Sequence, residues 1–267
     1  MAKQEKLAIE RAENLSPKMI FEVIRRDGQE ELERPNLSLM WSGVAAGIMI
    51  SLSVLGEAIF RTHLPDTGWR FLVENIGYSL GFLVVILGRM QLFTENTITT
   101  VLPVMQKPNR EMFSRMALLW AIVLFANVVG AFAAAALFAF TSAIPAELLP
   151  AIEELSRHAT GFEPAEAFQR AIPAGVLVAA IVWMLPESEG FGFFVILTFT
   201  WLIAAGDFTH VVAGSVEMAF LLVQGLLPPH DAIFGFFLPV LAGNILGGTA
   251  IFALLAFGQV RRELPDE

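Results

Sequence analysis

Two short stretches of this 267-residue chain place a Phe-Thr pair directly before an ionisable residue, and both lie deep inside apolar sequence. They are Phe93-Thr94-Glu95 and Phe208-Thr209-His210. A threonine hydroxyl can donate a hydrogen bond to an anion or to an imidazole, and a histidine exchanges its proton near neutral pH. Ionisable groups inside apolar segments are costly and indicate function. We interpret the two stretches as the two halves of one pore site.

The apolar runs around these stretches are too long for one simple membrane helix each. Residues 71–105 number 35 and residues 191–224 number 34, whereas about 20 residues cross the hydrocarbon. Irregular backbone at that depth is tolerated only where protein buries it or where it lines a wet cavity. Interrupted apolar segments in corresponding halves of a chain point to a transport site. The polar residues that predict the two breaks are Gly88, Arg89, Gln91, Thr94, Glu95 and Asn96, and Gly206, Asp207, Thr209 and His210.

Two simpler interpretations stay open at this point. The polar residues could form loops between pairs of short helices, which would give eight spans in place of six. His210 could be a histidine whose hydrogen bonds are satisfied within the core, which is the commoner role of a lone histidine. Its place in an apolar segment favours a functional role.

Composition predicts a multi-pass, all-α membrane protein. The chain is 55% hydrophobic, above the range of an ordinary soluble domain, and its mean hydropathy is positive at +0.64. It has no cysteine, and its net charge of −9 argues against a nucleic-acid partner. The four histidines lack metal-ligand spacing and no glycine-rich phosphate loop occurs, so we expect no enzyme activity, metal or cofactor.

The apolar segments predict three parts: a charged N-terminal segment (1–38), a transmembrane domain (39–258) and a C-terminal tail (259–267). Ser16-Pro17 could start a helix over 18–33, lying on the membrane surface or under the bundle. A solvated charged tail is the alternative. The six expected spans cover residues 39–60, 71–105 (broken), 112–142, 171–186 (short), 191–224 (broken) and 232–258. One or two short surface helices are expected within the acidic segment 143–170.

The distribution of basic residues predicts the orientation. Six spans place both termini on one side, and that side holds 12 Lys and Arg against four on the other, with Arg89 within the membrane completing the 17. The positive-inside rule then puts both termini in the cytoplasm.

The two halves carry matching elements. Three spans per half make any internal similarity an inverted repeat. Asn127-Val128-Val129-Gly130 in the third span matches Asn244-Ile245-Leu246-Gly247 in the sixth. The glycines allow close helix approach, and Asn127 and Asn244 can bond to a neighbouring helix. Gly88 and Gly206 take a structural role at the two breaks.

At these residues the chain resembles the formate/nitrite transporter family. The family's Glu-Leu-Phe-Thr core corresponds to 91–94 (QLFT), and its Phe-Glu-His-Ser stretch corresponds to 208–211 (FTHV). The charged segment 21–35 resembles a divergent branch of bacterial inner-membrane proteins. The resemblance implies an aquaporin-like protomer, a homopentamer in the inner membrane, and passage of small monovalent anions, often with a proton. It makes Thr94 and His210 the central pair, flanked by Tyr78, Phe82 and Ile203 as constriction candidates.

The chain also departs from the family pattern. Gln91, Thr209 and Gly214 replace the family's glutamate, glutamate and asparagine, Glu95 stands where a small residue is usual, and Asp207 is an added acid. A pore-facing Glu95 would repel an anion unless it were protonated or paired with Arg89. A pore for a neutral or cationic solute is therefore one alternative, and a non-transporting scaffold is another. Glu57 and Glu217 are intramembrane acids that could join a proton path.

Overall fold

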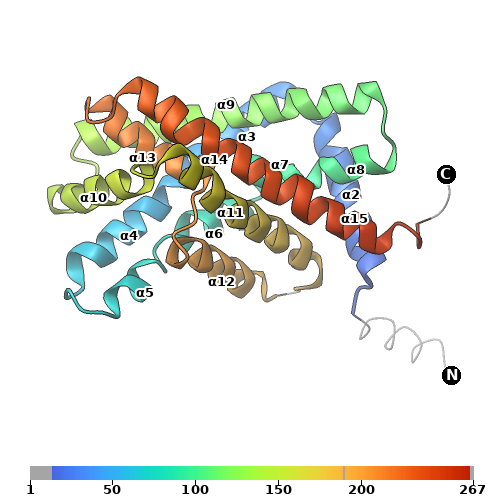
Figure 1. The fold of residues 1–267 in the computed structure, drawn as a ribbon, viewed down its shortest axis with the longest axis horizontal. Helices are drawn as coiled ribbons and strands as arrows, with labels where there is room; N and C mark the ends of the chain where they lie inside the picture. Colours follow the sequence, from blue (N-terminus) through green and yellow to red (C-terminus); the bar gives the residue numbers. More distant parts are fainter. Residues whose placement is uncertain (1–13, 189, 265–267) are drawn as a thin grey trace.

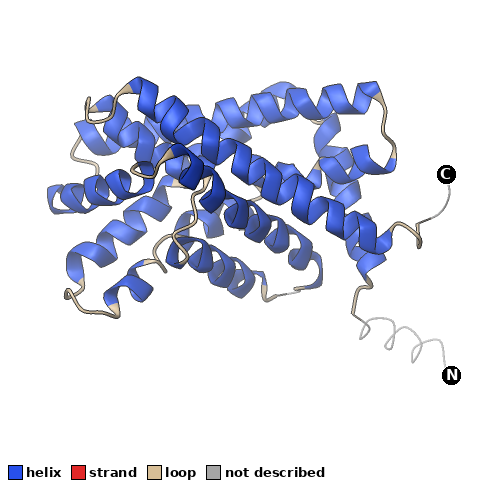
Figure 2. Ribbon diagram, viewed as in Figure 1, coloured by secondary structure: helices blue, strands red, loops and turns tan. Residues whose placement is uncertain are grey.

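The structure is a computed structural model that describes residues 14–188 and 190–264. Within these residues every regular element is helical (Figure 2). The first 13 residues of the expected N-terminal segment and the last three of the expected tail lie outside the described residues. Five helical segments are long and apolar enough to cross a membrane, namely Asn36–His63, Arg70–Leu87, Arg110–Phe140, Pro164–Glu187 and Asp231–Val260. The shorter apolar helices Gly192–Ala205 and Val211–Val223 accompany them.

The first half of the chain contains two helices that are interrupted and one that is not. Helix α9 runs unbroken over Arg110–Phe140 and starts at Asn109, whose side chain accepts from the Met112 amide. The remaining helices of this half are α3 (Asn36–Met49), α4 (Ser51–His63), α5 (Arg70–Glu74), α6 (Ser79–Leu87), α7 (Phe93–Thr99) and α8 (Val101–Gln106).

The second half has a corresponding break between α12 (Gly192–Ala205) and α13 (Val211–Val223), but its first long helix, α11 (Pro164–Met184), is continuous. This half also contains η1 (Ala146–Leu148), α10 (Leu149–Thr160) and η2 (Leu185–Glu187). A last continuous helix follows, made of η3 (Asp231–Phe237), α14 (Leu238–Ile245), η4 (Leu246–Ala253) and α15 (Leu254–Val260), of which η3 and η4 are π-helical.

The fourth span differs from the sequence prediction. A short span over 171–186 was expected, but α11 begins at Pro164 and is 21 residues long. Proline is favoured at the first position of a helix because its missing amide has no intrahelical partner there. The polar first turns of α11 therefore extend it beyond the apolar sequence. The rest of the acidic segment forms α10, which buries Ile152 and packs against α4 and α13.

Residues 17–33 form helix α2 (Pro17–Glu33). The Ser16 side chain accepts from the Met19 amide at 3.3 Å and caps the helix, and Pro17 occupies its first turn. Its buried face consists of Phe21, Ile24 and Gly28, and it packs on α7, α8 and α15. The segment is thus attached to the bundle and is not a solvated tail.

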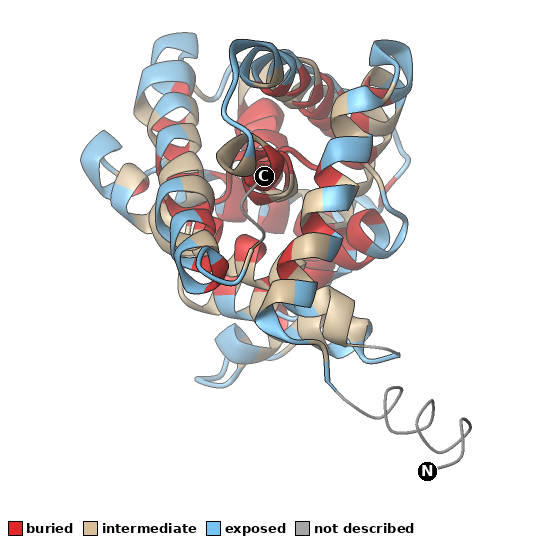
Figure 3. Cartoon of the chain, turned by 90° about the vertical axis from the view of Figure 1, so that its right-hand side faces the viewer, coloured by how far each residue is buried: buried red, intermediate tan, exposed pale blue. Residues whose placement is uncertain are grey.

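Small residues bring helices of each half into backbone contact. A Cβ on Gly47 would overlap the carbonyl of Asn127, and a Cβ on Gly175 would overlap that of Asn244. These contacts join α3 to α9 and α11 to α14, as small residues do in membrane helix pairs. Buried residues gather at the centre of the bundle, and exposed residues lie on its perimeter (Figure 3).

The bundle has two distinct ends. Helices α2, α8 and α15 lie at one end, on the right in Figure 1, and α5 and α10 lie at the other. We call these the α2 end and the α10 end. The two breaks, between α6 and α7 and between α12 and α13, lie between the two ends and carry the predicted site residues.

Candidate functional site

The two helix breaks have the same backbone geometry. Helix α6 stops at Leu87 and α12 at Ala205, and a glycine in right-handed conformation follows each, Gly88 and Gly206. The next residue is left-handed although it is not glycine, with φ of 51° at Arg89 and 55° at Asp207. Such a conformation costs a non-glycine residue about 1 kcal/mol.

Both breaks begin with a Schellman motif. The Met90 amide donates to the Val85 carbonyl at 3.0 Å, and the Phe208 amide donates to the Ile203 carbonyl at 3.0 Å. These bonds satisfy carbonyls that the end of a helix leaves without a partner. The two glycines are needed for space, because a Cβ on Gly206 would overlap the ring of Phe208 and a Cβ on Gly88 would overlap the Val84 carbonyl.

An asparagine from a continuous helix braces each break. The Oδ1 atom of Asn127 accepts from the Phe93 amide at 2.9 Å, and its Nδ2 atom donates to the carbonyls of Gly43 and Gln91 at 2.9 and 2.8 Å. Asn127 is fully buried, as is Asn244, which has the equivalent place in the second half. Asn127 thereby satisfies one amide and one carbonyl of the break and also bonds to a carbonyl of α3.

Asn244 does the same for the second break. Its Oδ1 atom accepts from the Val211 amide at 2.8 Å, and its Nδ2 atom donates to the carbonyls of Ala171 and Thr209 at 2.8 and 3.1 Å. The two Asn-x-x-Gly elements thus hold the starts of α7 and α13 in equivalent ways. Helix α7 begins at Phe93, so Thr94 lies in its first turn, whereas His210 directly precedes α13.

Thr94 and His210 meet at the centre of the molecule. Thr94 Oγ1 lies 2.8 Å from His210 Nε2, and both side chains are buried. His210 also caps α13, because its Nδ1 atom accepts from the Ala213 amide at 3.2 Å. An amide can only donate, so Nδ1 carries no hydrogen and Nε2–H is the donor to Thr94. The Thr94 hydroxyl hydrogen is then free to bond to a solute.

Aromatic rings surround this pair. The Phe82 ring lies 5.1 Å from the imidazole of His210 at 75°, and Tyr78 lies 5.1 Å from Phe82. Phe93 instead packs edge-on against Trp120 at 5.6 Å. The structure therefore brings Phe82 to the central pair and Tyr78 next to Phe82. Ile203, the third constriction candidate, is fully buried and makes the Schellman bond of the second break.

A cavity of about 290 Å³ opens toward the α10 end, and we call it the α10-side cavity. His210 lines it, as do the predicted residues Tyr78, Phe208, Thr209 and Asp207. The Thr209 hydroxyl donates to the Ala167 carbonyl at 2.8 Å, so it is used within the protein. The cavity also receives two acids from different helices, Glu57 of α4 and Glu217 of α13.

Asp207 is held in an ion-pair network at this end. Its carboxylate lies 2.7 Å from His158 Nε2 and accepts from Arg170 Nη1 at 2.9 Å. Arg170 also stacks over the Phe162 ring at 4.4 Å. The hydrogen bond to Asp207 raises the pKa of the His158 imidazole above its usual value, against partial burial, which lowers it. Sequence reasoning missed His158 and Arg170, because no local spacing links them to Asp207.

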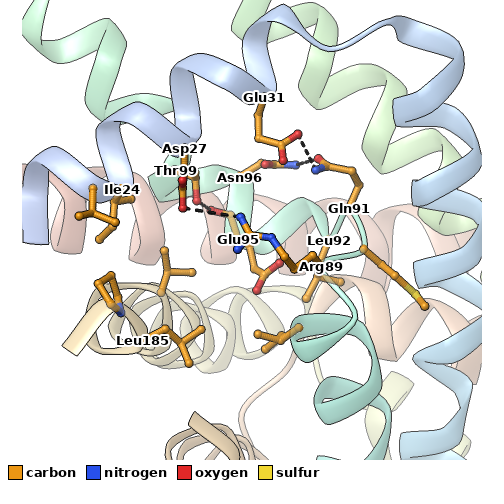
Figure 4. A pocket seen from close by; sticks show the side chains of 15 residues that line it. Ile24, Asp27, Glu31, Arg89, Gln91, Leu92, Glu95, Asn96, Thr99 and Leu185 are labelled. Carbon is orange, nitrogen blue, oxygen red and sulfur yellow. Dashed lines mark hydrogen bonds and ion pairs between the residues drawn. The ribbon is translucent and has the colours of Figure 1, made fainter. Parts of the chain in front are cut away.

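A second cavity of about 300 Å³ opens toward the α2 end (Figure 4), and we call it the α2-side cavity. Its polar residues form a chain in which Asn96 Nδ2 donates to Gln91 Oε1 at 3.0 Å and Gln91 Nε2 donates to Glu31 Oε2 at 2.7 Å. Helix α2 therefore reaches the first break directly. Sequence reasoning missed Glu31, which lies 60 positions from its partner.

Glu95 lies in the α2-side cavity with Arg89. The sequence left two ways for Glu95 to avoid repelling an anion, protonation or an ion pair with Arg89. The Arg89 guanidinium pairs with Asp27 at 3.9 Å. Among the described residues no group of three or more His, Asp or Glu could hold a metal ion. The central pair thus lies between two cavities that both contain carboxylates.

Comparison with known proteins places these features in one family. A family model described as formate/nitrite transporter matches residues 18–258. The inner membrane protein YfdC of Escherichia coli is 44% identical over 248 residues, which cover 93% of this chain and 80% of that protein. The formate channel FocA of Haemophilus influenzae is 27% identical over 250 residues, covering 81% of this chain and 84% of that protein.

A solved structure agrees with the fold. A pentameric formate channel with formate bound superposes with a TM-score of 0.74 at 20% identity, covering 85% of this chain and 98% of that chain.

Proposed function

This chain belongs to the formate/nitrite transporter family, whose members are channels and transporters and not enzymes, and we propose that it passes small monovalent anions such as formate or nitrite across the bacterial inner membrane. The curated relatives named as an inner membrane protein and as a formate channel support the location and the class of solute. The pentameric channel of the same fold supports assembly as a homopentamer with one pore in each protomer.

The proposed topology has six spans in two inverted repeats, with the second and fifth spans broken and both termini in the cytoplasm. The repeated Schellman motifs and asparagine braces support the two breaks. The excess of Lys and Arg at the α2 end supports the orientation. On this assignment the α2-side cavity faces the cytoplasm and the α10-side cavity faces the periplasm.

The hydrogen bond of 2.8 Å between Thr94 and His210 carries the functional proposal. An anion entering a dry passage loses hydration and needs donors that are already oriented. Nε2–H of His210 polarises the Thr94 hydroxyl, which offers its own hydrogen to the anion. The N-terminus of α13 adds partial positive charge beside His210.

We propose that passage is linked to a proton through His210. A proton can reach the imidazole only at Nδ1, since Nε2 already carries one, and Nδ1 is taken by the Ala213 amide. Protonation therefore requires the cap of α13 to open. His210 holds the extra proton only during passage and rests as the neutral donor to Thr94.

The test is uptake of formate and nitrite into proteoliposomes at about pH 5 and about pH 7. Wild-type protein is expected to show uptake stimulated by acid, and His210→Ala is expected to lose it. Protein-free vesicles measure the leak of the neutral acid through lipid. Unchanged acid stimulation in a correctly assembled His210→Ala pentamer would remove His210 from the proton path.

A pore for a neutral or cationic solute is the second candidate. It is favoured by the acidic side chains of both cavities. Glu95 lines the α2-side cavity, and Glu57 and Glu217 line the α10-side cavity. Currents under a bi-ionic gradient separate the two candidates, because the sign of the reversal potential reports whether anions or cations carry the flux. The absence of any flux in assembled wild-type protein would instead favour a scaffold.

A further inference from the structure

Most ionisable side chains of the α10-side cavity are committed to ion pairs. Arg61 Nη2 lies 2.8 Å from the Glu74 carboxylate, and Arg61 Nη1 lies 3.3 Å from that of Glu154. Asp207 is held by His158 and Arg170. In the described part of the chain, Glu57 and Glu217 are the two carboxyls of this cavity for which no hydrogen bond or ion pair is formed.

Both of these carboxyls are more than nine-tenths buried. Glu57 is 6% exposed and Glu217 is 8% exposed, and both line the cavity that contains His210. They come from α4 and α13, which pack together, and both line the same cavity as Tyr78. Two buried carboxylates that share a site without a counter-ion cannot both stay charged at low cost.

We propose that Glu57 and Glu217 form a proton-loading pair, which takes protons from the α10 side and supplies the proton that crosses with the anion. The proposal rests on the proposed function and extends it, because His210 is a poor first acceptor while the Ala213 amide occupies Nδ1. The pair has no such competing bond. It offers a store of protons in the same cavity as His210.

The transfer balances without any other reactant. A carboxylate of the pair takes a proton from a hydronium ion at the α10 end, which leaves a water molecule, and becomes a carboxylic acid. When an anion such as formate enters the cavity, the O–H bond of that acid breaks and the proton passes to the formate oxygen, directly or through His210. The neutral formic acid crosses the dry centre, and the carboxylate is ready to be reloaded.

Charged groups on the surrounding helices leave this assignment intact. The cation nearest in sequence to Glu57 is Arg61, whose guanidinium bonds to Glu74 and Glu154. On α10 the facing groups are His158, bound to Asp207, and Glu154, bound to Arg61. On η3, Asp231 contacts His230 at 3.1 Å. Tyr78 contributes a hydroxyl that can relay a proton but is a far weaker acid than a carboxyl.

The test replaces the pair and measures proton and anion movement separately. Proteoliposomes that contain a trapped pH indicator report proton uptake, and labelled formate reports anion uptake. In the double variant Glu57→Gln/Glu217→Gln, acid stimulation and formate-driven proton uptake are expected to be lost. Glu153→Gln is the matched control, because Glu153 lies on α10, is partly exposed and pairs with Arg157. Size-exclusion chromatography reports assembly of each variant.

A second measurement keeps the test independent of transport. Infrared difference spectra of the purified pentamer, taken across pH, report the carbonyl band of protonated carboxyls. The wild type and Glu153→Gln are expected to show a titrating band that the double variant lacks. Equal bands in all three proteins would overturn the proposal, and so would full proton coupling in the double variant. Wild-type protein that shows the band but moves no formate would refute the proposed function and leave the proton pair standing.

Discussion

Thr94 Oγ1 and His210 Nε2 lie 2.8 Å apart although 116 positions separate the two residues in the chain. The bond requires both helix breaks to be in place, because Thr94 lies at the start of α7 and His210 caps α13. The cap fixes the tautomer of the imidazole, and the tautomer fixes which atom donates to Thr94. One backbone amide, that of Ala213, thereby sets the polarity of the central site.

This arrangement can be tested with variants that separate the two roles of His210, which caps α13 through Nδ1 and donates to Thr94 through Nε2. His210→Asn keeps a residue that caps helices well but removes the ring that reaches Thr94. We expect the Asn variant to assemble with nearly wild-type thermal stability and to lose anion uptake. His210→Ala should lose uptake as well as about 1 kcal/mol of stability from the missing cap. Wild-type uptake by the Asn variant would contradict the role of Nε2–H.

The asparagine braces predict a loss of stability in each half. Asn127→Ala and Asn244→Ala each remove three hydrogen bonds to buried backbone groups. At about 0.6 kcal/mol for each bond within a membrane, we expect a loss of about 2 kcal/mol in each variant. The measurement is thermal unfolding in detergent. Asn75→Ala is the control, because the Asn75 side chain makes one local bond to Phe71. Equal losses in all three would argue against bracing.

The contact between α2 and the first break can be tested with a charge swap. Gln91→Glu would place a carboxylate against Glu31, which now accepts from Gln91 at 2.7 Å. We expect repulsion to release this part of α2 and to increase hydrogen exchange of its amides. The double variant Gln91→Glu/Glu31→Gln restores a donor and an acceptor and should restore protection. Failure of the second change to rescue the first would show that the two side chains are not coupled.

The His158–Asp207 pair predicts a pH dependence of the α10 end. Because the folded protein raises the pKa of His158, the pair stabilises the fold fully below the unfolded pKa of about 6.5. This contribution is lost as pH rises through the raised folded value. We expect α10 to become less protected from hydrogen exchange over that window. His158→Gln should flatten the dependence, and an identical profile in the variant would contradict the assignment.

Gly28 predicts tight docking of α2. A Cβ at this position would overlap the Thr99 carbonyl, so Gly28→Ala should displace α2 from α7 and make it more sensitive to limited proteolysis. Gly68→Ala is the control, since a Cβ on Gly68 meets open space. Equal cleavage of both variants would indicate that α2 is not held at this contact.

The sequence predicted local features of the fold better than distant contacts. Polar residues within long apolar runs indicated the interruptions after Gly88 and Gly206, and the family resemblance carried by Thr94 and His210 is confirmed by the family model. The predicted start of the fourth span was wrong, because the prediction used apolar content alone and the first turns of α11 are polar. Proline at position 164 was the signal that could have found it.

Contacts between distant segments could not be predicted in the same way. The bonds of Glu31 to Gln91 and of His158 to Asp207 join residues 60 and 49 positions apart. A single sequence gives no information on which polar side chain a buried group meets. The sequence did mark Asn127 and Asn244 as polar residues in apolar helices, but their bonding to the breaks depends on the approach of α9 and α14.

The asparagine braces also have a kinetic consequence. Each break is tied to a continuous helix of its own half, and the two breaks are joined through Thr94 and His210. One half therefore cannot rock against the other without breaking buried bonds, and such domain motions take roughly microseconds to milliseconds. Side-chain rotation takes roughly picoseconds to nanoseconds. Solutes are then expected to cross at rates typical of a channel, and counterflow, the signature of a carrier, should be absent.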